Sequence, residues 1–208
     1  ILANPTRGIT ADRGMQRRSS KKLPRMSKHT VLGFLDECSP QTTANTQRMW
    51  SFDRTPLVKN TTEIWANTFA ILAVNGTSIA TFRERSKQED IQEVLREYKR
   101  ANPNKRLVIV LDNFSSHHAI RVRKYAAGNK IRLAYLPPYS PDLNPLEQIW
   151  RAIKREVSAT FIRDYKHLTA TIIAEFERLA GKKTYWEKWV VKFLSPKYAS
   201  KMLGQQLY

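Results

Sequence analysis

The chain has 208 residues, of which 41% are hydrophobic and 10% aromatic, so it can bury one sizeable core and is not a disordered polymer. A formal net charge of +18 predicts a polyanionic partner, and nucleic acid is the commonest one. An anionic membrane surface is the alternative, but no apolar run reaches the ~18 residues needed to span a bilayer, so we expect no membrane insertion.

Cys38 is the only cysteine, which excludes an intrachain disulfide and a thiolate metal site. The first residues lack both an initiator Met and the layout of a signal peptide. We therefore expect an intracellular protein of the cytoplasm and nucleoid, or of the nucleus in a eukaryote, whose chain begins at a fragment or processing boundary.

Residues 1–29 carry eight Arg and Lys side chains against one acid, Asp12, and show no helical or strand periodicity. This pattern predicts a basic N-terminal arm or linker that is irregular alone and becomes ordered on DNA; a solvated tail is the alternative. The cations that we expect to contact DNA are Arg17, Arg18, Lys21 and Lys22.

The first regular elements are strands. Residues 30–35 form a continuous apolar run, typical of a central strand covered on both faces, and Asp36 follows it. Residues 65–74 and 77–82 flank Asn75-Gly76, a strong hairpin signal. We expect Trp65 in this segment to belong to the core.

Helices and strands then alternate. A capping box at 86–89 predicts a helix that ends before Pro103, and residues 107–111 form a second apolar strand followed by Asp112. A helix over 116–127, ended by Gly128, precedes a strand over 131–136.

The last third of the chain begins with four prolines, which make a stiff loop over 137–145. Helices follow at 145–159 and 165–180, and a final amphipathic stripe runs from Trp186 to Phe193. That stripe either packs on the domain or pairs with a second subunit. The order of elements predicts an α/β fold with a mixed sheet.

Asp36 and Asp112 each follow an apolar strand. If these strands are neighbours, about 4.8 Å apart, the two carboxylates converge at one sheet edge, where they repel each other unless a cation joins them. Oxygen ligands without a His or Cys cluster favour magnesium or manganese, and two such ions support phosphodiester chemistry. Each aspartate alone could instead cap a turn.

Glu147 has two interpretations. It could close a capping box with Asn144 or pair with Arg151. It could also be a metal ligand whose position is set by the proline loop. Arg151, Lys154 and Arg155 share the neighbouring helix face, where a phosphate backbone could run.

Three segments, FLDE at 34–37, VLDNFSSHHA at 110–119 and LPPYSPDLNPLEQIW at 136–150, resemble the DDE transposases of the mariner superfamily, particularly its prokaryotic insertion-sequence branch. The resemblance covers about 31–158 and includes the spacing of 34 residues between Asp112 and Glu147. It implies a ribonuclease-H-like mixed five-stranded sheet flanked by helices, and a catalytic, metal-binding triad of Asp36, Asp112 and Glu147. Asp53 is the alternative first acid.

The same resemblance implies a metal-dependent endonuclease and polynucleotidyl transferase that uses two divalent cations, magnesium or manganese. Such an enzyme cuts the ends of a mobile element and joins the freed 3′ hydroxyl to target DNA, in relatives at TA dinucleotides. Because two ends are paired, we expect a homodimer on double-stranded DNA. We expect residues 30–160 to form the catalytic domain and 161–208 a helical extension packed on it.

Relatives usually carry an N-terminal helix-turn-helix region, which we do not find in these residues, so we expect a catalytic domain without its specificity module. A non-catalytic DNA-binding protein derived from a transposase, and a nuclease that never joins strands, remain alternatives. Asn113 and His117 are expected to support the site, or to bond locally and lie at the surface. Tyr139 and Ser140 are expected either to contact DNA or to brace the proline loop.

Overall fold

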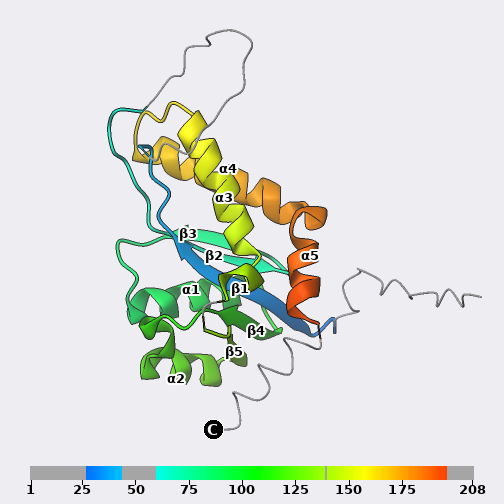
Figure 1. Ribbon diagram of the computed structural model, residues 1–208. Coiled ribbons are helices and arrows are strands. Elements are labelled where there is room, and N and C mark those ends of the chain that lie inside the picture. Colours follow the sequence, from blue (N-terminus) through cyan, green and yellow to red (C-terminus); the bar gives the residue numbers. More distant parts are fainter. Residues whose placement is uncertain (1–26, 44–59, 139, 196–208) are drawn as a thin grey trace, which may run out of the picture.

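Figure 1 shows the computed structural model, which describes residues 27–43, 60–138 and 140–195. Its five strands form one mixed sheet, as the sequence predicts, and their order is β3-β2-β1-β4-β5. The strands are β1 (Thr30–Cys38), β2 (Thr68–Ala73), β3 (Ile79–Phe82), β4 (Arg106–Leu111) and β5 (Ile131–Tyr135). The helices are α1 (Gln88–Ala101), η1 (Ser115–His118), α2 (Ile120–Gly128), η2 (Pro141–Leu143), α3 (Leu146–Ala159), α4 (Tyr165–Gly181) and α5 (Lys183–Phe193).

The central strand β1 runs parallel to β4 and antiparallel to β2. Its register aligns Phe34 with Val110, so the ends of the two parallel strands meet at the same sheet edge, as predicted. Gly33 stands in the middle of β1 because a Cβ atom there would lie 2.7 Å from the Tyr98 hydroxyl oxygen and 2.8 Å from a methyl of Ile71. The backbone of β1 can therefore approach α1 closely.

Helices cover both faces of the sheet (Figure 1). Alternate residues of β1 divide between two cores: Val31 and Leu35 pack with α1 and α2, whereas Leu32 and Phe34 pack with α3, α4 and α5. This alternation decides which side chains near the end of β1 can face which helical layer.

The C-terminal stripe is part of the second core. Trp186, Val190 and Phe193 are buried, and the ring of Phe193 meets that of Phe34 edge-on at a centroid distance of 5.0 Å. Of the two interpretations of the stripe, packing on the domain is therefore the one observed. No helix in the three described ranges is both long and apolar enough to cross a membrane.

Several local predictions were wrong in detail. The first strand continues to Cys38, because β2 pairs with it to that residue, so Asp36 lies inside β1 opposite Ala70. Trp65 is 52% exposed: β2 starts only at Thr68, and Trp65 makes an isolated bridge to Gln41.

Turn geometry also differs from the sequence patterns. The hairpin has a longer loop than Asn75-Gly76 suggested, because Ile71 pairs with Ile79 and the Asn75 side chain bonds to β1 instead. After β4, the predicted helix is divided into η1 and α2. Its C-terminal turn places Lys130, and not Gly128, at a positive φ of 58°.

Helix α1 begins at Gln88, one residue later than the predicted capping box at 86–89 implies. The Asp90 carboxylate, and not that of Glu89, accepts a hydrogen bond from the Lys87 amide at 3.0 Å. The Ser86 hydroxyl accepts a bond from the Asn67 side chain and so does not cap the helix.

Candidate active site

One cleft brings together the three predicted acids. Asp36 comes from β1, Asp112 from the loop after β4, and Glu147 from the first turn of α3. The cleft has a volume of about 280 Å³, and its wall is completed by Phe114, by Asn113 and by the loop between β5 and α3. The acids lie far apart in the sequence, so the sheet and α3 together position them. We call this site the acidic cleft.

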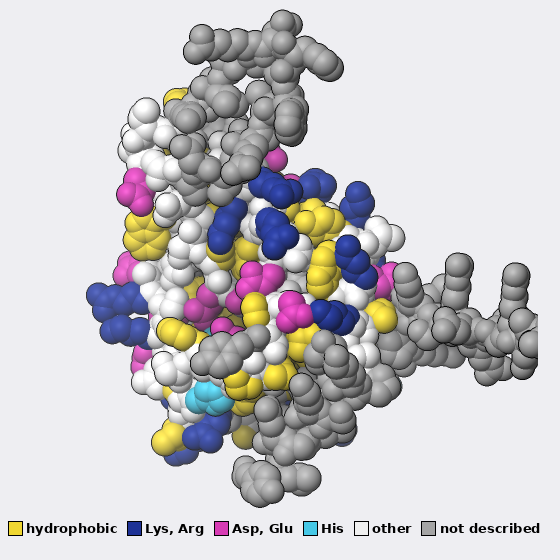
Figure 2. Space-filling view, viewed as in Figure 1, with side chains coloured by type: hydrophobic (Ala, Val, Ile, Leu, Met, Phe, Trp, Pro, Cys, Tyr) yellow, Lys and Arg dark blue, Asp and Glu magenta, His cyan; other side chains and the backbone are white. Residues whose placement is uncertain are grey.

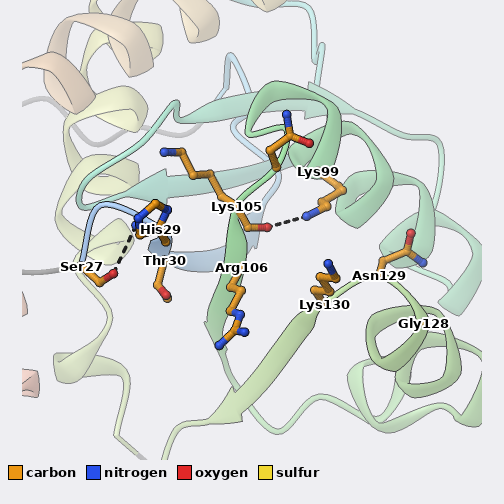
Figure 3. A pocket seen from close by; sticks show the side chains of 10 residues that line it. Ser27, His29, Thr30, Lys99, Lys105, Arg106, Gly128, Asn129 and Lys130 are labelled. Atoms are coloured by element: carbon orange, nitrogen blue, oxygen red, sulfur yellow. Dashed lines mark hydrogen bonds between the residues drawn. The ribbon is translucent and has the colours of Figure 1, made fainter.

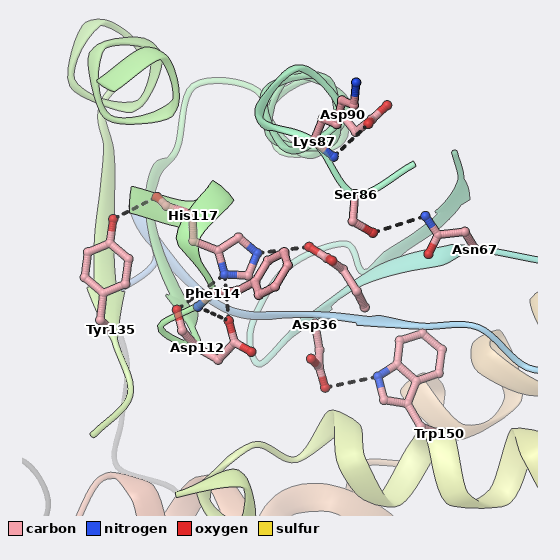
Figure 4. A network of polar contacts seen from close by, with 11 residues as sticks. Asp36, Asn67, Ser86, Lys87, Asp90, Asp112, Phe114, His117, Tyr135 and Trp150 are labelled. Atoms are coloured by element: carbon pink, nitrogen blue, oxygen red, sulfur yellow. Dashed lines mark hydrogen bonds and ion pairs between the residues drawn. The ribbon is translucent and has the colours of Figure 1, made fainter. Parts of the chain in front are cut away.

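Asp36 faces α3. Its Oδ2 accepts a hydrogen bond of 3.1 Å from the indole Nε1 of Trp150, which is itself buried (Figure 4). Burial, followed by the negative charge of Glu147, raises the pKa of Asp36 to about 7, and Asp112 adds to the shift. Burial and the neighbouring negative charges therefore disfavour the ionised form of Asp36 unless a cation lies close to it.

Asp112 is fixed by two donors. Its Oδ1 accepts a hydrogen bond of 3.0 Å from the Phe114 amide and lies 2.7 Å from Nδ1 of His117 (Figure 4). The hydrogen bond from His117, followed by that from the Phe114 backbone, lowers the pKa of Asp112 despite partial burial. Asp112 is thus an ionised acid in a defined orientation.

His117 connects two acids. Its other ring nitrogen, Nε2, lies 2.9 Å from Oε1 of Glu37, and only 2% of its surface is exposed. Burial lowers the pKa of His117, but the bonds to Asp112 and Glu37 outweigh it and raise the pKa to about 9. A doubly protonated ring can donate to both carboxylates, and Tyr135 holds the backbone of His117 through a hydrogen bond of 3.0 Å to its carbonyl.

His117 is therefore a buried link, as a supporting role requires, and not a surface residue. The Asn113 amide donates to the carbonyl oxygen of Leu136, 23 residues away, and thus ties the Asp112 loop to the start of the proline loop. This long-range bond fits a supporting role and not a local bond within the turn. Oδ1 of Asn113 lies 3.2 Å from Nε2 of His118, whose ring stacks on Tyr135.

Glu147 makes no capping box within the described residues. The amide of Asn144, which such a box would use, donates instead to the carbonyl oxygen of Pro141 at 2.9 Å. The Asn144 side chain accepts the Leu146 amide at 3.1 Å and so begins α3 without help from Glu147. Glu147 is exposed and lines the acidic cleft, and no salt bridge to Arg151 is formed in the described part of the chain.

The proline loop places the start of α3. Pro145, Asn144 and Leu143 are buried between the sheet and the C-terminal helices, and Asp142 in η2 forms an ion pair with Lys192 of α5. Ser140 lines the cleft and its hydroxyl donates to the Pro138 carbonyl oxygen. The first turn of α3 is therefore anchored from both sides.

A divalent cation fits the chemistry of this cleft. Its acids supply hard oxygen ligands only, and a cation would relieve the repulsion that raises the pKa of Asp36. Within the described ranges, no three His, Cys, Asp or Glu side chains stand close enough to surround a single ion. Magnesium does not need three, since it keeps several waters and uses one or two carboxylates.

Cations gather beside the acids. Figure 2 shows a group of Lys and Arg side chains over α3, next to the Asp and Glu side chains in the middle of the same face. Arg151, Lys154 and Arg155 of α3 are all exposed. Other predicted residues lie outside the described residues, namely Arg17, Arg18, Lys21, Lys22, Tyr139 and the alternative acid Asp53.

Sequence reasoning missed three residues of the site: Glu37, Trp150 and Phe114. The alternation of β1 contained the signal for Glu37, because Asp36 and Glu37 must point to opposite faces, one toward α3 and the other toward η1. Trp150 belongs to the apolar stripe of α3, and nothing in that pattern shows that its N–H reaches Asp36. Phe114 is 50% exposed at the cleft, which no pattern predicts.

Comparison with known proteins identifies the family of this chain. The model of a family described as DDE superfamily endonuclease matches residues 31–169. The transposable element Tcb1 transposase of Caenorhabditis briggsae is 33% identical over 75 residues, which are 36% of this chain and 28% of that protein. An uncharacterized protein of Sinorhizobium fredii, y4pE/y4sA, is 27% identical over 122 residues, covering 57% of this chain and 88% of that one.

Solved structures support the same fold. The mariner Mos1 paired end complex with Mg has a TM-score of 0.59 at 17% identity and matches 86% of this chain and 56% of the Mos1 chain. The Mos1 transposase catalytic domain, solved with raltegravir and Mn, has a TM-score of 0.56 at 16% identity and matches 86% of this chain and 84% of that one. The ribonuclease-H-like fold expected from the sequence is thereby confirmed. The chain spans 28% of the nematode transposase and about half of the full Mos1 chain.

Proposed function

We propose a function from one premise, which is that the chain belongs to the DDE superfamily endonuclease family. In this proposal the chain acts as the catalytic domain of a cut-and-paste transposase. It cleaves DNA at the ends of a mobile element and joins the freed 3′ hydroxyl to target DNA. The observation that carries this proposal is the meeting of Asp36, Asp112 and Glu147 in one cleft of a chain with a net charge of +18. Acids at the surface of so basic a protein can hold cations while the surrounding surface holds DNA.

The proposed cofactors are two divalent cations, magnesium or manganese, with Asp36, Asp112 and Glu147 as ligands. When bound, such ions activate the attacking oxygen and stabilise the leaving one. Mos1 structures containing Mg and Mn support this choice.

The residues of the chain supply orientation. Trp150 holds Asp36 against α3, while His117 and the Phe114 amide hold Asp112 in one rotamer. Glu147 stands on a helix whose first turn is anchored by Asn144. Fixed carboxylates lose little freedom when they bind an ion, which is the contribution that a protein scaffold makes to this chemistry.

The proposed reaction has two steps, and in each of them one bond to phosphorus forms as another breaks. In the first, a water oxygen attacks phosphorus, the bond from phosphorus to the 3′ oxygen breaks, and a 3′ hydroxyl and a 5′ phosphate result. In the second, that 3′ hydroxyl attacks a phosphodiester of the target, which releases a target 3′ hydroxyl. Arg151, Lys154 and Arg155 on α3 would neutralise the phosphates that approach the acidic cleft.

The finer partners belong to the same proposal: element ends and target as double-stranded DNA, insertion at TA, and a homodimer on DNA. The Mos1 structures to which the chain is similar include a strand transfer complex and a paired end complex, which supports DNA ends as partners. Ser140, Tyr139 and the arm residues Arg17, Arg18, Lys21 and Lys22 remain proposed DNA contacts.

The test is nicking and strand transfer on supercoiled plasmid in manganese, comparing the wild type with Glu147→Gln. Glutamine keeps the size and helix propensity of the side chain but removes the charge that a metal requires. Glu156→Gln is the matched control, because it removes one charge from an exposed position near the other end of α3. We expect the wild type and the control to cut and Glu147→Gln to be inactive.

Equal cutting by all three proteins would refute the role of Glu147. Cutting without any joined product would reduce the function to that of a nuclease. No cutting by the wild type, on plasmid or on plasmid that carries cognate ends, would leave only DNA binding and refute the proposal.

A further inference from the structure

A large basic pocket lies at the sheet edge opposite the acidic cleft (Figure 3). It has a volume of about 720 Å³ and is formed by the ends of α1 and α2 and the starts of β1, β4 and β5. Its lining residues are Ser27, His29, Thr30, Lys99, Asn104, Lys105, Arg106, Gly128, Asn129 and Lys130. We call these ten residues the basic pocket.

Four cations and no acid line the basic pocket. Arg106 pairs with Thr30 in the sheet, and the next residue, Leu107, pairs with Ile131, so Arg106 and Lys130 occupy neighbouring strand positions about 4.8 Å apart. Among the described residues, neither Arg106 nor Lys130 forms an ion pair with a carboxylate. Their like charges face the same space without internal compensation.

The other two lysines are held in place by backbone oxygens. Lys99 Nζ donates to the Lys105 carbonyl oxygen at 2.5 Å, and Lys105 Nζ donates to the Lys28 carbonyl oxygen at 2.8 Å. An ammonium group has three N–H donors, so each retains donors for a further acceptor. Figure 3 shows Lys99, Lys105, Arg106 and Lys130 around the beginning of β4.

The backbone at Lys130 gives a second, independent observation. Lys130 has a φ of 58°, a left-handed conformation that favours glycine and costs a long side chain about 1 kcal/mol. A lysine at such a position is unfavourable for folding, and sites of this kind cluster where a side chain binds a ligand. Asparagine adopts a left-handed conformation more readily than lysine, yet it is Lys130, and not its neighbour Asn129, that has the positive φ.

The neutral part of the lining matches the same ligand. Ser27, Thr30, Asn104 and Asn129 offer hydroxyl and amide groups, which are common partners of phosphate oxygens. Among the described residues, no Phe, Tyr or Trp lines the pocket, so these residues offer no stacking platform of the kind on which single-stranded nucleic acid relies. The chemistry is that of a phosphodiester backbone recognised without regard to base sequence.

We propose that the basic pocket binds the phosphate backbone of a second DNA duplex, distinct from the one that the acidic cleft acts on. Asp36 lies six residues after Thr30 in β1, about 20 Å along the strand, and the two sites face opposite ends of the parallel strands. A duplex that contacted both sites would have to bend around the domain, which a short segment of DNA, stiff over ~150 base pairs, resists. That a first duplex lies at the acidic cleft rests on the proposed function.

The direct test is lysine protection. The full chain is acetylated in EDTA, which prevents cleavage, with and without a duplex of about 30 base pairs, and the modified positions are found by mass spectrometry. We expect Lys130 and Lys105 to lose labelling when the duplex is present, while Lys166 on α4, which is exposed and in the opposite layer, keeps it. Equal labelling of Lys130 and Lys105 in both samples would refute the proposal.

A bridging assay tests the second duplex. One duplex is fixed to beads, and capture of a second, fluorescent duplex through the protein is measured in EDTA. Replacing both Arg106→Gln and Lys130→Gly should reduce capture at least ~10-fold, because two phosphate contacts and their counterion release are lost. Lys166→Gln, which removes one positive charge from the opposite layer and so matches Arg106→Gln alone in charge, should capture as the wild type does.

The Lys130→Gly change is designed to separate binding from folding. Glycine accepts a φ of 58° without strain, so the melting temperature of the Lys130→Gly variant should equal or exceed that of the wild type. Arg106→Gln alone, at an exposed strand start, is the second variant and should lower capture by a smaller factor.

Two outcomes would overturn the inference. Undiminished capture by the double variant would mean that another surface, or a second copy of the chain, holds the second duplex. Protection of Lys130 by poly-L-glutamate but not by the duplex would assign the pocket to an acidic peptide. Both assays run without cleavage, so they can fail while wild-type nicking stands, and nicking can fail while they succeed.

Discussion

At the carboxyl ends of β1 and β4, three carboxylates share the acidic cleft, whereas at the amino ends of β1, β4 and β5 four cations share the basic pocket. The acids are held by specific donors: Trp150 for Asp36, and His117 for Asp112. In the basic pocket, the Lys99 and Lys105 ammonium groups donate to backbone carbonyl oxygens, and none of the four cations forms an ion pair within the described residues.

This difference in support fits a difference in task. Phosphodiester chemistry depends on ligand positions to a fraction of an ångström, so its carboxylates need fixed rotamers. Attraction of a phosphate backbone tolerates movement of long side chains, because it depends mainly on the number of cations near it. We therefore expect substitutions at the acidic cleft to affect rate steeply, and those at the basic pocket to affect binding gradually.

The largest effect is expected for Asp112→Asn. The change removes the charge of a carboxylate that His117 orients, so metal-dependent nicking should fall by at least ~10³-fold while DNA affinity in EDTA is unchanged or higher. Nicking of plasmid and a parallel anisotropy titration measure the two quantities. Activity within tenfold of the wild type would show that Asp112 is not part of the reaction.

His117→Ala should have the next largest effect. Loss of the link between Glu37 and Asp112 frees both carboxylates, and comparable losses of a supporting residue cost about 10–100-fold in activity or metal affinity. A shift of the manganese concentration for half-maximal nicking to higher values would distinguish this role from simple destabilisation. His118→Gln is the control, since His118 stacks on Tyr135 but contacts neither acid.

Trp150→Phe should be milder. Phenylalanine keeps most of the buried ring but cannot donate to Asp36, so nicking should fall only several-fold. Because the indole hydrogen bond lowers the pKa of Asp36, its loss should also move the acid limb of the pH–rate profile upward. An unchanged profile together with unchanged activity would show that the indole only packs.

The smallest effect is expected for Asp36→Asn, on the melting temperature of the protein without metal. Asp36 keeps its proton in the folded state up to a pH of about 7, against 3.8 when unfolded, so folding weakens as the pH rises through that window. Asp36→Asn removes this penalty and should raise the melting temperature at pH 8 by about 4 °C. Magnesium should stabilise the wild type at pH 8 but not this variant; equal melting curves for both proteins would contradict the account.

Much of the fold around the acidic cleft can be predicted from the sequence. The apolar runs predict β1 and β4 as buried strands, the proline loop predicts the start of α3, and the segments around Asp112 and Glu147 carry the family resemblance. The rule that strand ends meet at a sheet edge groups Asp36 with Asp112 only if β1 and β4 are neighbours, as their register shows them to be. Glu147 joins these two acids in the sequence analysis only through the resemblance.

Other features depend on tertiary contacts that no periodic pattern carries. The link from His117 to Glu37 joins residues 80 positions apart, and the bond from Trp150 to Asp36 spans 114. Asn144 could have capped α3 with Glu147, and only the donation of its amide to Pro141 leaves the glutamate out of that box. The basic pocket escapes detection because its cations come from three separate places: the last turn of α1, the start of β4 and the turn between α2 and β5.

Iron-mediated cleavage can show whether Asp36, Asp112 and Glu147 share bound divalent cations. The full chain is incubated with Fe²⁺, ascorbate and peroxide, so that radicals formed at the metal cut the nearby backbone, and the fragments are mapped by mass spectrometry. We predict cuts close to residues 36, 112 and 147 that excess Mg²⁺ suppresses and that Asp112→Asn abolishes. Cuts elsewhere in the chain, or the same cuts in Asp112→Asn, would contradict the account.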